Sequence, residues 1–184
     1  MPIENETKFE VDDFDEIVPK LLKLGAKLIW KGNEKTFFFD FPNRRLKKAH
    51  TLVRLREWPG HSCSITSKTK VLGKLSKKNK HKYQYKRRDE NQLEAPSIKI
   101  GRKFLESIGL VETFYYTKRR EHWEIGKAFV ELDIIEEGGK KRYFVEIEAS
   151  RKIIPHLTKR IGLSWNRVVT EGYVTIIKQM KAQK

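Results

Sequence analysis

Charged residues recur along the chain, mostly in pairs of one sign that are separated by a single residue. Because successive side chains of a strand alternate between its two faces, the members of such a pair share a face. Clustered carboxylates suit a hard divalent cation, whereas arginine and lysine suit phosphate oxygens through charge-assisted hydrogen bonds. The acids are Glu4, Glu6, Glu90, Glu131, Asp133, Glu146 and Glu148, and the bases are Lys8, Arg54, Arg56, Lys68, Arg88, Lys118 and Arg120. A ligand that carries a metal ion and several phosphates would engage both sets.

Two interpretations of this pattern stay open. An ordinary antiparallel sheet, with its apolar face on the core and its charged face in water, also produces it. The alternative places the charged faces inside a closed barrel, where they must compensate each other because an unpaired buried ion costs several kcal/mol. Segregation of acids and bases onto different strands favours the barrel, since random surface charge would mix the signs more evenly. The named acids and bases are equal in number, so the interior of such a barrel would be close to neutral.

Eight segments with period-two alternation are predicted to be strands, and eight antiparallel strands can close around side chains or one small ligand. They span residues 3–11, 34–41, 51–58, 62–70, 82–92, 113–125, 127–136 and 141–150. Glycines mark two of the turns, at Gly126 and at Gly138–Gly139. We therefore expect an α+β fold, a closed eight-stranded antiparallel β-barrel with helices packed outside it, in a single domain of residues 1–184.

Helices are predicted between and after the strands. Asp12 or Asp13 can cap a first helix that ends near Gly25, although Pro19 argues against a regular first half. A second helix is expected between Pro96 and Gly109, and the C-terminal third offers the helical segments 153–163 and 168–180. The apolar positions predicted for burial are Phe14, Ile17, Leu21 and Leu24 in the first helix, Ile100, Phe104, Leu105 and Ile108 in the second, and Val168, Tyr173, Ile176, Ile177 and Met180 in the last.

Composition limits the setting of the protein. The 184-residue chain carries 40 Lys and Arg against 24 Asp and Glu, a formal net charge of +16 that favours polyanionic partners. Part of the excess lies in residues 68–88, whose middle, 73–82, is interpreted as a solvated basic loop between two strands. Cys63 is the only cysteine, which excludes a disulfide within the chain and a thiolate zinc site. No apolar run reaches the length of a membrane span and the N-terminus does not resemble a signal peptide, so we expect a cytoplasmic location and no membrane partner.

The order of these motifs resembles the CYTH superfamily, the triphosphate tunnel metalloenzymes. The matching elements are ExExK with Glu4, Glu6 and Lys8, FFDF with Asp40, LxRxR with Arg54 and Arg56, ITSK with Lys68, RxE with Arg88 and Glu90, KxR with Lys118 and Arg120, ELD with Glu131 and Asp133, and EIE with Glu146 and Glu148. The resemblance covers residues 3 to about 150. It implies a tunnel barrel that binds triphosphate compounds with Mg²⁺ or Mn²⁺, often as a homodimer. The chain departs from the family at Gln92, where RxExE commonly has a second acid.

The resemblance also implies roles for the site residues. Glu4, Glu6, Glu146 and Glu148, with Asp133 as a fifth, would hold one or two divalent ions, and Glu90 and Glu131 are further candidate metal ligands. Arg54, Arg56, Lys68, Arg88, Lys118 and Arg120 would bind the triphosphate. Lys8, Glu4, Glu6 and Asp133 form the candidate catalytic group. Lys8 itself has three open roles: it binds phosphate, orients the attacking water, or pairs with Glu6.

The preferred function is therefore metal-dependent hydrolysis of the terminal phosphate of a triphosphate compound, above all inorganic triphosphate, with nucleoside triphosphates as further substrates. Class IV adenylyl cyclases use the same tunnel to make cyclic AMP from ATP and are the first alternative. Bacterial cyclases of that class typically carry a His-Phe pair upstream of ExExK, and only three residues precede Glu4 here, so we expect the pair to be missing. Thiamine triphosphate and RNA 5′ ends are further substrates within the resemblance. A barrel that binds RNA or polyphosphate without cleaving it is the second alternative.

Overall fold

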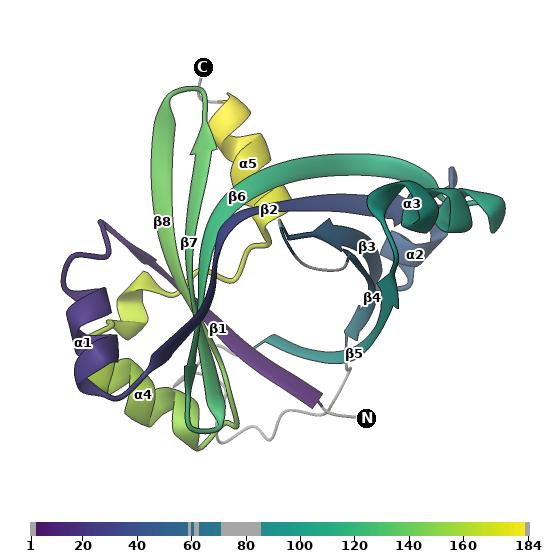
Figure 1. Cartoon of the computed structure of the whole chain (residues 1–184). Coiled ribbons are helices and arrows are strands. Elements are labelled where there is room, and N and C mark those ends of the chain that lie inside the picture. The colour runs from purple at the N-terminus through teal and green to yellow at the C-terminus, as the bar shows by residue number, and fades with distance from the viewer. Residues whose placement is uncertain (1–2, 59, 61–62, 71–85, 183–184) are drawn as a thin grey trace, which may run out of the picture. The chain divides into compact units, whose positions relative to one another are not determined.

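The computed structural model describes residues 3–58, 60, 63–70 and 86–182, and at residues 3, 4, 86 and 87 it describes the backbone alone (Figure 1). Within this part of the chain there are eight strands and five α-helices. The strands are β1 (Ile3–Val11), β2 (Lys27–Asp40), β3 (Thr51–Glu57), β4 (Cys63–Lys70), β5 (Lys86–Ala95), β6 (Val111–Ile125), β7 (Ala128–Glu137) and β8 (Lys140–Glu148). The helices are α1 (Ile17–Lys23), α2 (Arg45–Lys48), α3 (Ile98–Ser107), α4 (Ile153–Ile161) and α5 (Tyr173–Ala182), with a 3₁₀ helix η2 (Trp165–Arg167). The basic loop predicted at 73–82 and the start of the strand predicted at 82–92 lie outside the described residues.

The chain divides into two compact units. Among the described residues, the first unit consists of residue 3 and residues 32–58, 60, 63–70 and 88–118. The second unit consists of residues 4–31, 86–87 and 119–182. Each unit has its own hydrophobic core, and each is described separately below.

The first unit contains an antiparallel ladder in the order β2, β3, β4, β5. Phe38 lies opposite Arg54, Arg54 opposite Thr66, and Thr66 opposite Gln92. Helix α3 packs on β3 and β4 at very short range, because a Cβ on Gly101 would lie 2.7 Å from Leu55 Cδ1. The buried core of this unit contains Phe39, Leu55, Cys63, Ile65, Ala95, Leu105 and Leu110.

The second unit contains an antiparallel ladder in the order β6, β7, β8, β1. Glu131 on β7 lies opposite Glu146 on β8, which lies opposite Lys8 on β1. The same register brings Arg120 on β6 opposite Asp133 on β7. Helix α4 packs against α1 and β8, and α5 packs against β7. The core includes Phe9, Leu21, Trp123, Val130, Leu132, Val145, Ile147, Ile154 and Ile161.

The α+β class and the antiparallel eight-stranded sheet are confirmed, and closure of the sheet into a barrel stays a prediction. The predicted strand 3–11 matches β1 at both ends. Strand β2 begins at Lys27, seven residues before the predicted start, so residues 27–33, which lay outside the predicted strand, belong to it. The C-terminal prediction is confirmed in part: Tyr173 and the three predicted apolar residues that follow it in α5 are buried. The helix begins five residues later than predicted, and Val168 is half-buried in a β-bridge with Phe9.

Two helix predictions need correction. Helix α1 begins at Ile17 without a side-chain cap, so the predicted cap at Asp12 or Asp13 is wrong; Asp13 Oδ1 instead accepts a hydrogen bond from the amide of Asp15 at 2.9 Å. The later start makes Pro19 the third helical residue, where a missing amide hydrogen costs no intrahelical bond. In α3, capped by Ser97, the predicted apolar positions other than Leu105 are about half exposed. Helix α3 instead faces the sheet with Gly101 and Leu105, because a glycine leaves room for the close approach to Leu55.

Candidate functional site

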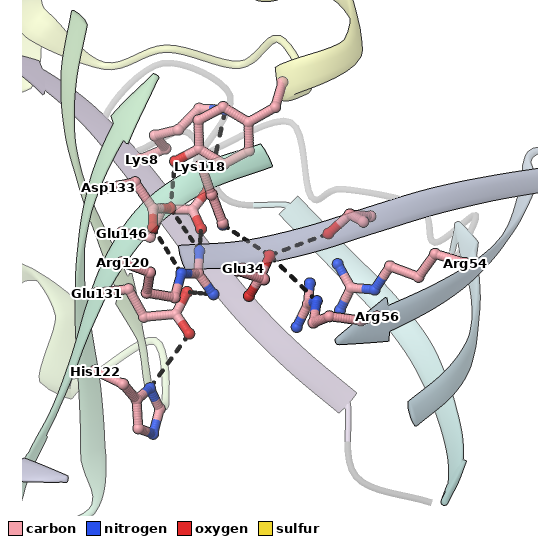
Figure 2. Close-up of polar contacts among 12 residues, drawn as sticks. Lys8, Glu34, Arg54, Arg56, Lys118, Arg120, His122, Glu131, Asp133 and Glu146 are labelled. Carbon is pink, nitrogen blue, oxygen red and sulfur yellow. Dashed lines mark hydrogen bonds and ion pairs between the residues drawn. The ribbon is translucent and has the colours of Figure 1, made fainter. Parts of the chain in front are cut away.

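Two basic side chains of the first unit, Arg56 and Lys118, contact a buried carboxylate, Glu34 on β2 (Figure 2). Glu34 is fully buried, and its Oε1 lies 3.3 Å from Arg56 Nε and 3.5 Å from Lys118 Nζ. The same oxygen accepts a hydrogen bond from Thr36 Oγ1 at 3.1 Å, and Oε2 accepts one from Trp58 Nε1 at 3.0 Å. We define the base cluster as Glu34, Arg54, Arg56, Lys68, Glu90 and Lys118.

The base cluster carries more positive than negative charge. Its second acid, Glu90, lies 2.7 Å from Lys68 Nζ through Oε2 and 3.6 Å from Arg54 Nη2 through Oε1. Two acids thus face four bases, and three of those bases are at most 7% exposed. Burial lowers the pKa of Arg54, and the charge of neighbouring Arg56 lowers it further, so a bound anion would stabilise its charged form.

Three buried polar atoms in the first unit accept or donate no hydrogen bond within the part of the chain that is described. They are Arg54 Nε, Arg56 Nε and Ser64 Oγ. Strand alternation places Arg54 and Arg56 on one face of β3, and Ser64 lies opposite Arg56 on β4. Arg56 Nε still has Glu34 Oε1 as an ion-pair neighbour at 3.3 Å, whereas Arg54 Nε makes no hydrogen bond among the described residues. A buried donor without a hydrogen bond is costly, so this face of the ladder suits an anion with several oxygens.

Three acids of the second unit gather on β7 and β8. One carboxylate oxygen each from Glu131, Asp133 and Glu146 lies within 4.8 Å of the other two. Asp133 is fully buried and Glu146 is 7% exposed. Glu131 lies directly opposite Glu146, and like charges in that position repel, so the arrangement needs a cation to hold it.

Arg120 on β6 supplies that cation (Figure 2). Its Nε donates to Asp133 Oδ1 at 2.6 Å, and its Nη2 donates to Asp133 Oδ2 at 2.5 Å and to Glu146 Oε2 at 2.9 Å. Its Nη1 lies 2.5 Å from Glu131 Oε2. We define the acid cluster as Arg120, Glu131, Asp133 and Glu146.

Two further side chains contact the acid cluster from β1 and α5. Tyr173 donates its hydroxyl to Asp133 Oδ2 at 2.6 Å. Burial raises the pKa of Tyr173 well above its ordinary value, and the charge of Asp133 raises it further, so the hydroxyl keeps its proton at neutral pH. Lys8 Nζ donates to the carbonyl oxygen of Glu171 at 2.6 Å and lies 3.9 Å from Glu146 Oε1 and 4.1 Å from the centre of the Tyr173 ring.

Ten of the fourteen residues nominated from the sequence lie in or against one of the two clusters, five in each unit. Arg54, Arg56, Lys68, Glu90 and Lys118 lie in the base cluster, and Lys8, Arg120, Glu131, Asp133 and Glu146 lie in or against the acid cluster. Glu6 and Glu148 oppose each other across β1 and β8, and Arg88 lies opposite Lys70 across β4 and β5. The side chain of Glu4 lies outside the described residues.

Some residues have surroundings that the sequence did not indicate. Arg120, grouped with the phosphate-binding bases from its sequence, is surrounded by carboxylates. Lys8 contacts Glu146. Asp40 accepts hydrogen bonds from the amides of Phe41, Leu46 and Lys47, so it anchors the start of α2. Sequence reasoning missed Glu34, whose only signal was its two-residue spacing from polar Thr36 at the predicted start of a strand.

The fold and the charge clusters define an α+β protein whose antiparallel sheet carries acids and bases in separate groups. Comparison with known proteins identifies the family: the model of the CYTH domain matches residues 2–172, so the chain belongs to the CYTH domain family. Members of this family act on triphosphate compounds and use divalent metals.

Individual relatives span nearly the whole chain. "Putative adenylate cyclase MJ0240" of Methanocaldococcus jannaschii is 23% identical over 95% of this chain and 98% of its own. The solved structure of a "putative adenylate cyclase" from Vibrio parahaemolyticus has a TM-score of 0.79 at 18% identity, over 96% of this chain and 98% of that one. "Putative adenylyl cyclase HpAC1" from Hippeastrum, described with a dominant triphosphatase activity, has a TM-score of 0.65 at 14% identity and covers 96% of both chains. At these identities the two structures establish the fold alone.

None of the described helices is long and apolar enough to span a membrane.

Proposed function

We propose that this protein hydrolyses the terminal phosphoanhydride bond of a triphosphate compound, above all inorganic triphosphate, with Mg²⁺ or Mn²⁺. The observation that carries the proposal is the base cluster, in which buried bases outnumber acids and Arg54 Nε lacks a hydrogen-bond partner in the described part of the chain. A compact polyanion matches this donor set better than a neutral ligand. The triphosphatase activity described for the Hippeastrum relative supports the same reaction class.

The acid cluster fits a divalent metal by the chemistry of its donors. Hard cations such as Mg²⁺ and Mn²⁺ prefer carboxylate oxygens, and three carboxylates converge within 4.8 Å. Glu131, Asp133 and Glu146 would hold the ion, and the resemblance keeps Glu4, Glu6, Glu90 and Glu148 as further candidates. When bound, the ion supplies positive charge that offsets the charge developing on the transferred phosphoryl group.

The chain's own bases would supply the rest of the stabilisation. Arg54, Arg56, Lys68 and Lys118 bind and orient phosphate oxygens, and the family pattern adds Arg88 and Arg120. Phosphoryl transfer depends mainly on positioning and electrostatic stabilisation, and both are stronger among buried groups than in water. Lys8 is a positioning residue in this proposal, because its contact with Glu146 and the Glu171 carbonyl holds that carboxylate near the other two. The proposal also includes closure of the sheet into a barrel, a single domain of residues 1–184, a homodimer and a cytoplasmic location.

The test is incubation of the purified protein with inorganic triphosphate or, separately, ATP, in Mg²⁺, Mn²⁺ or EDTA, with all products resolved by chromatography. We expect one orthophosphate and one pyrophosphate per inorganic triphosphate, with metal and not with EDTA. Cyclic AMP and pyrophosphate from ATP would favour the cyclase instead, the function that the names of the Methanocaldococcus and Vibrio relatives suggest. Tight triphosphate binding that persists in EDTA without any product would favour a barrel that only binds.

A matched pair of variants shows whether the acid cluster takes part. Glu146→Gln removes one carboxylate at nearly constant size, and we expect triphosphate turnover to fall at least about 100-fold, because even residues that only support metal ligands cost about 10- to 100-fold. Glu136→Gln on β7, where the glutamate side chain is 60% exposed, is the control and should keep wild-type turnover. Wild-type turnover in Glu146→Gln, beside an unchanged circular dichroism spectrum, would remove Glu146 from the site.

A further inference from the structure

The acid cluster already contains a cation of its own. Arg120 is 4% exposed, and its guanidinium contacts all three carboxylates through Nε, Nη1 and Nη2. Arginine stays charged under all ordinary conditions, and its planar fork matches carboxylates well. The guanidinium therefore occupies the position that the donor set would offer to a metal ion.

Every carboxylate oxygen of the three acids has a described neighbour. Both oxygens of Asp133 accept hydrogen bonds from Arg120, and Oδ2 also accepts one from Tyr173. Glu146 uses Oε2 for Arg120, and its Oε1 lies 3.9 Å from Lys8 Nζ. Glu131 uses Oε2 for Arg120, and its Oε1 lies 3.3 Å from His122 Nδ1. A divalent ion cannot coordinate both oxygens of Asp133 together with Oε2 of Glu131 and Oε2 of Glu146 while the guanidinium is bound to those four oxygens.

The charge balance of the cluster nevertheless favours a second cation. Three carboxylates face one guanidinium, so the buried group keeps an excess of negative charge that Lys8 at 3.9 Å offsets only in part. Replacing a single charge by a double charge would compensate the carboxylates more fully, and this gain is large in a buried environment. The cluster can thus exchange one cation for another.

We propose that Arg120 is an internal competitor of the metal: a divalent cation binds Glu131, Asp133 and Glu146 only by displacing the Arg120 guanidinium, which is then free to bind phosphate. The inference rests on the proposed function for the identity of the cation. It implies weak metal binding by the protein alone and tighter binding with triphosphate, because a phosphate that holds Arg120 removes the competitor. Such coupling is reciprocal and is typically about 5- to 150-fold.

The test is a titration of the substrate-free protein with Mn²⁺, in which electron paramagnetic resonance measures free Mn²⁺. Three proteins are compared: wild type, Arg120→Gln, and the control Arg119→Gln at the exposed neighbouring position of β6. We expect Arg120→Gln to bind one Mn²⁺ at least about tenfold more tightly than wild type, and Arg119→Gln to match wild type. Equal or weaker Mn²⁺ binding by Arg120→Gln, or no binding by any of the three at millimolar Mn²⁺, would overturn the inference.

A second measurement needs no variant and covers the case in which Arg120→Gln does not fold. Nitrogen-15 NMR of the wild-type protein can follow the Arg120 Nε–H that is hydrogen-bonded to Asp133. Saturating Mg²⁺ should shift that resonance strongly or expose it to solvent exchange, and an unchanged resonance at saturation would contradict displacement. Neither measurement depends on turnover, so a protein that hydrolyses no triphosphate can still confirm or refute the competition.

Discussion

The two units each contain a buried charge cluster. Bases outnumber acids in the cluster of the first unit, and acids outnumber bases in that of the second. In the first unit Arg56 and Lys118 contact the carboxylate of Glu34, while Arg54 and Lys68 contact that of Glu90. In the second unit three acids contact the single guanidinium of Arg120. The clusters differ in how completely they are satisfied. All carboxylate oxygens of the acid cluster have described neighbours, whereas Arg54 Nε in the base cluster has no hydrogen-bond partner among the described residues. The base cluster can therefore accept an anion directly, while the acid cluster must first release its own cation.

The largest effects should come from removing the central residue of each cluster. Glu34→Gln and Arg120→Gln leave like charges buried and uncompensated, so each should lower the free energy of unfolding at pH 7 by about 3 kcal/mol. Urea unfolding measures both, with Glu136→Gln as a control that should change stability by less than about 0.5 kcal/mol. Losses below about 1 kcal/mol in both variants would break the comparison.

Ligand rescue should differ between the same two variants. Mn²⁺ should raise the melting temperature of Arg120→Gln more than that of wild type, because the acids gain a replacement cation. Inorganic triphosphate with EDTA should do the same for Glu34→Gln, because the bases gain a replacement anion. Equal rescue of both variants by either ligand would contradict the opposite roles of the two clusters.

Period-two alternation predicted most of the sheet, because a strand that buries one face must alternate whatever its partners are. It could not assign neighbours across strands. The contacts of Arg120 lie 13 and 26 residues away, at Asp133 and Glu146, and depend on a register that is set by the turns. Its sign placed it with the bases, but its surroundings are acidic.

Residues without a charged partner at i+2 were the hardest to find. Glu34 stands at the predicted start of a strand and has no charged residue two positions away, so the pair spacing that nominated other acids did not include it. Tyr173 was predicted as a buried apolar position of a helix, which is correct, but the helix periodicity does not say that its hydroxyl meets Asp133. Such roles follow from packing between segments that are distant in sequence.

A smaller loss of stability should show that the Tyr173 hydroxyl stabilises the acid cluster by its hydrogen bond and not only by packing of its ring. Tyr173→Phe removes only the hydroxyl that donates to Asp133, and leaving that buried acceptor without the bond should cost about 1–3 kcal/mol in urea unfolding. Tyr115→Phe is the control, since Tyr115 is 62% exposed and should change stability by less than about 0.5 kcal/mol. Equal losses in the two variants would mean that the hydroxyl of Tyr173 does not stabilise the cluster.

The smallest effect concerns a partly exposed ion pair of the second unit, which gives a scale for the buried ones. Arg142 donates from Nε and Nη2 to the two carboxylate oxygens of Glu10, both at 2.7 Å, and the side chains are 28% and 30% exposed. The hydrogen bond to Arg142 lowers the pKa of Glu10 below its ordinary value of about 4.3. The pair therefore stabilises the fold above about pH 5, and this contribution is lost as the pH falls through the lowered pKa.

Glu10→Gln should accordingly cost about 1 kcal/mol or less at pH 7 and less at pH 3, because wild-type Glu10 loses its charge as the pH falls through its lowered pKa. Urea unfolding of wild type and variant at the two pH values measures the difference. Glu16→Gln, at a pair whose glutamate side chain is 84% exposed, is the control and should change stability less than Glu10→Gln at pH 7. A loss that is the same at both pH values would come from packing and not from charge. In that case the stability contribution of this partly exposed ion pair could not be compared with those of the buried clusters around Glu34 and Arg120.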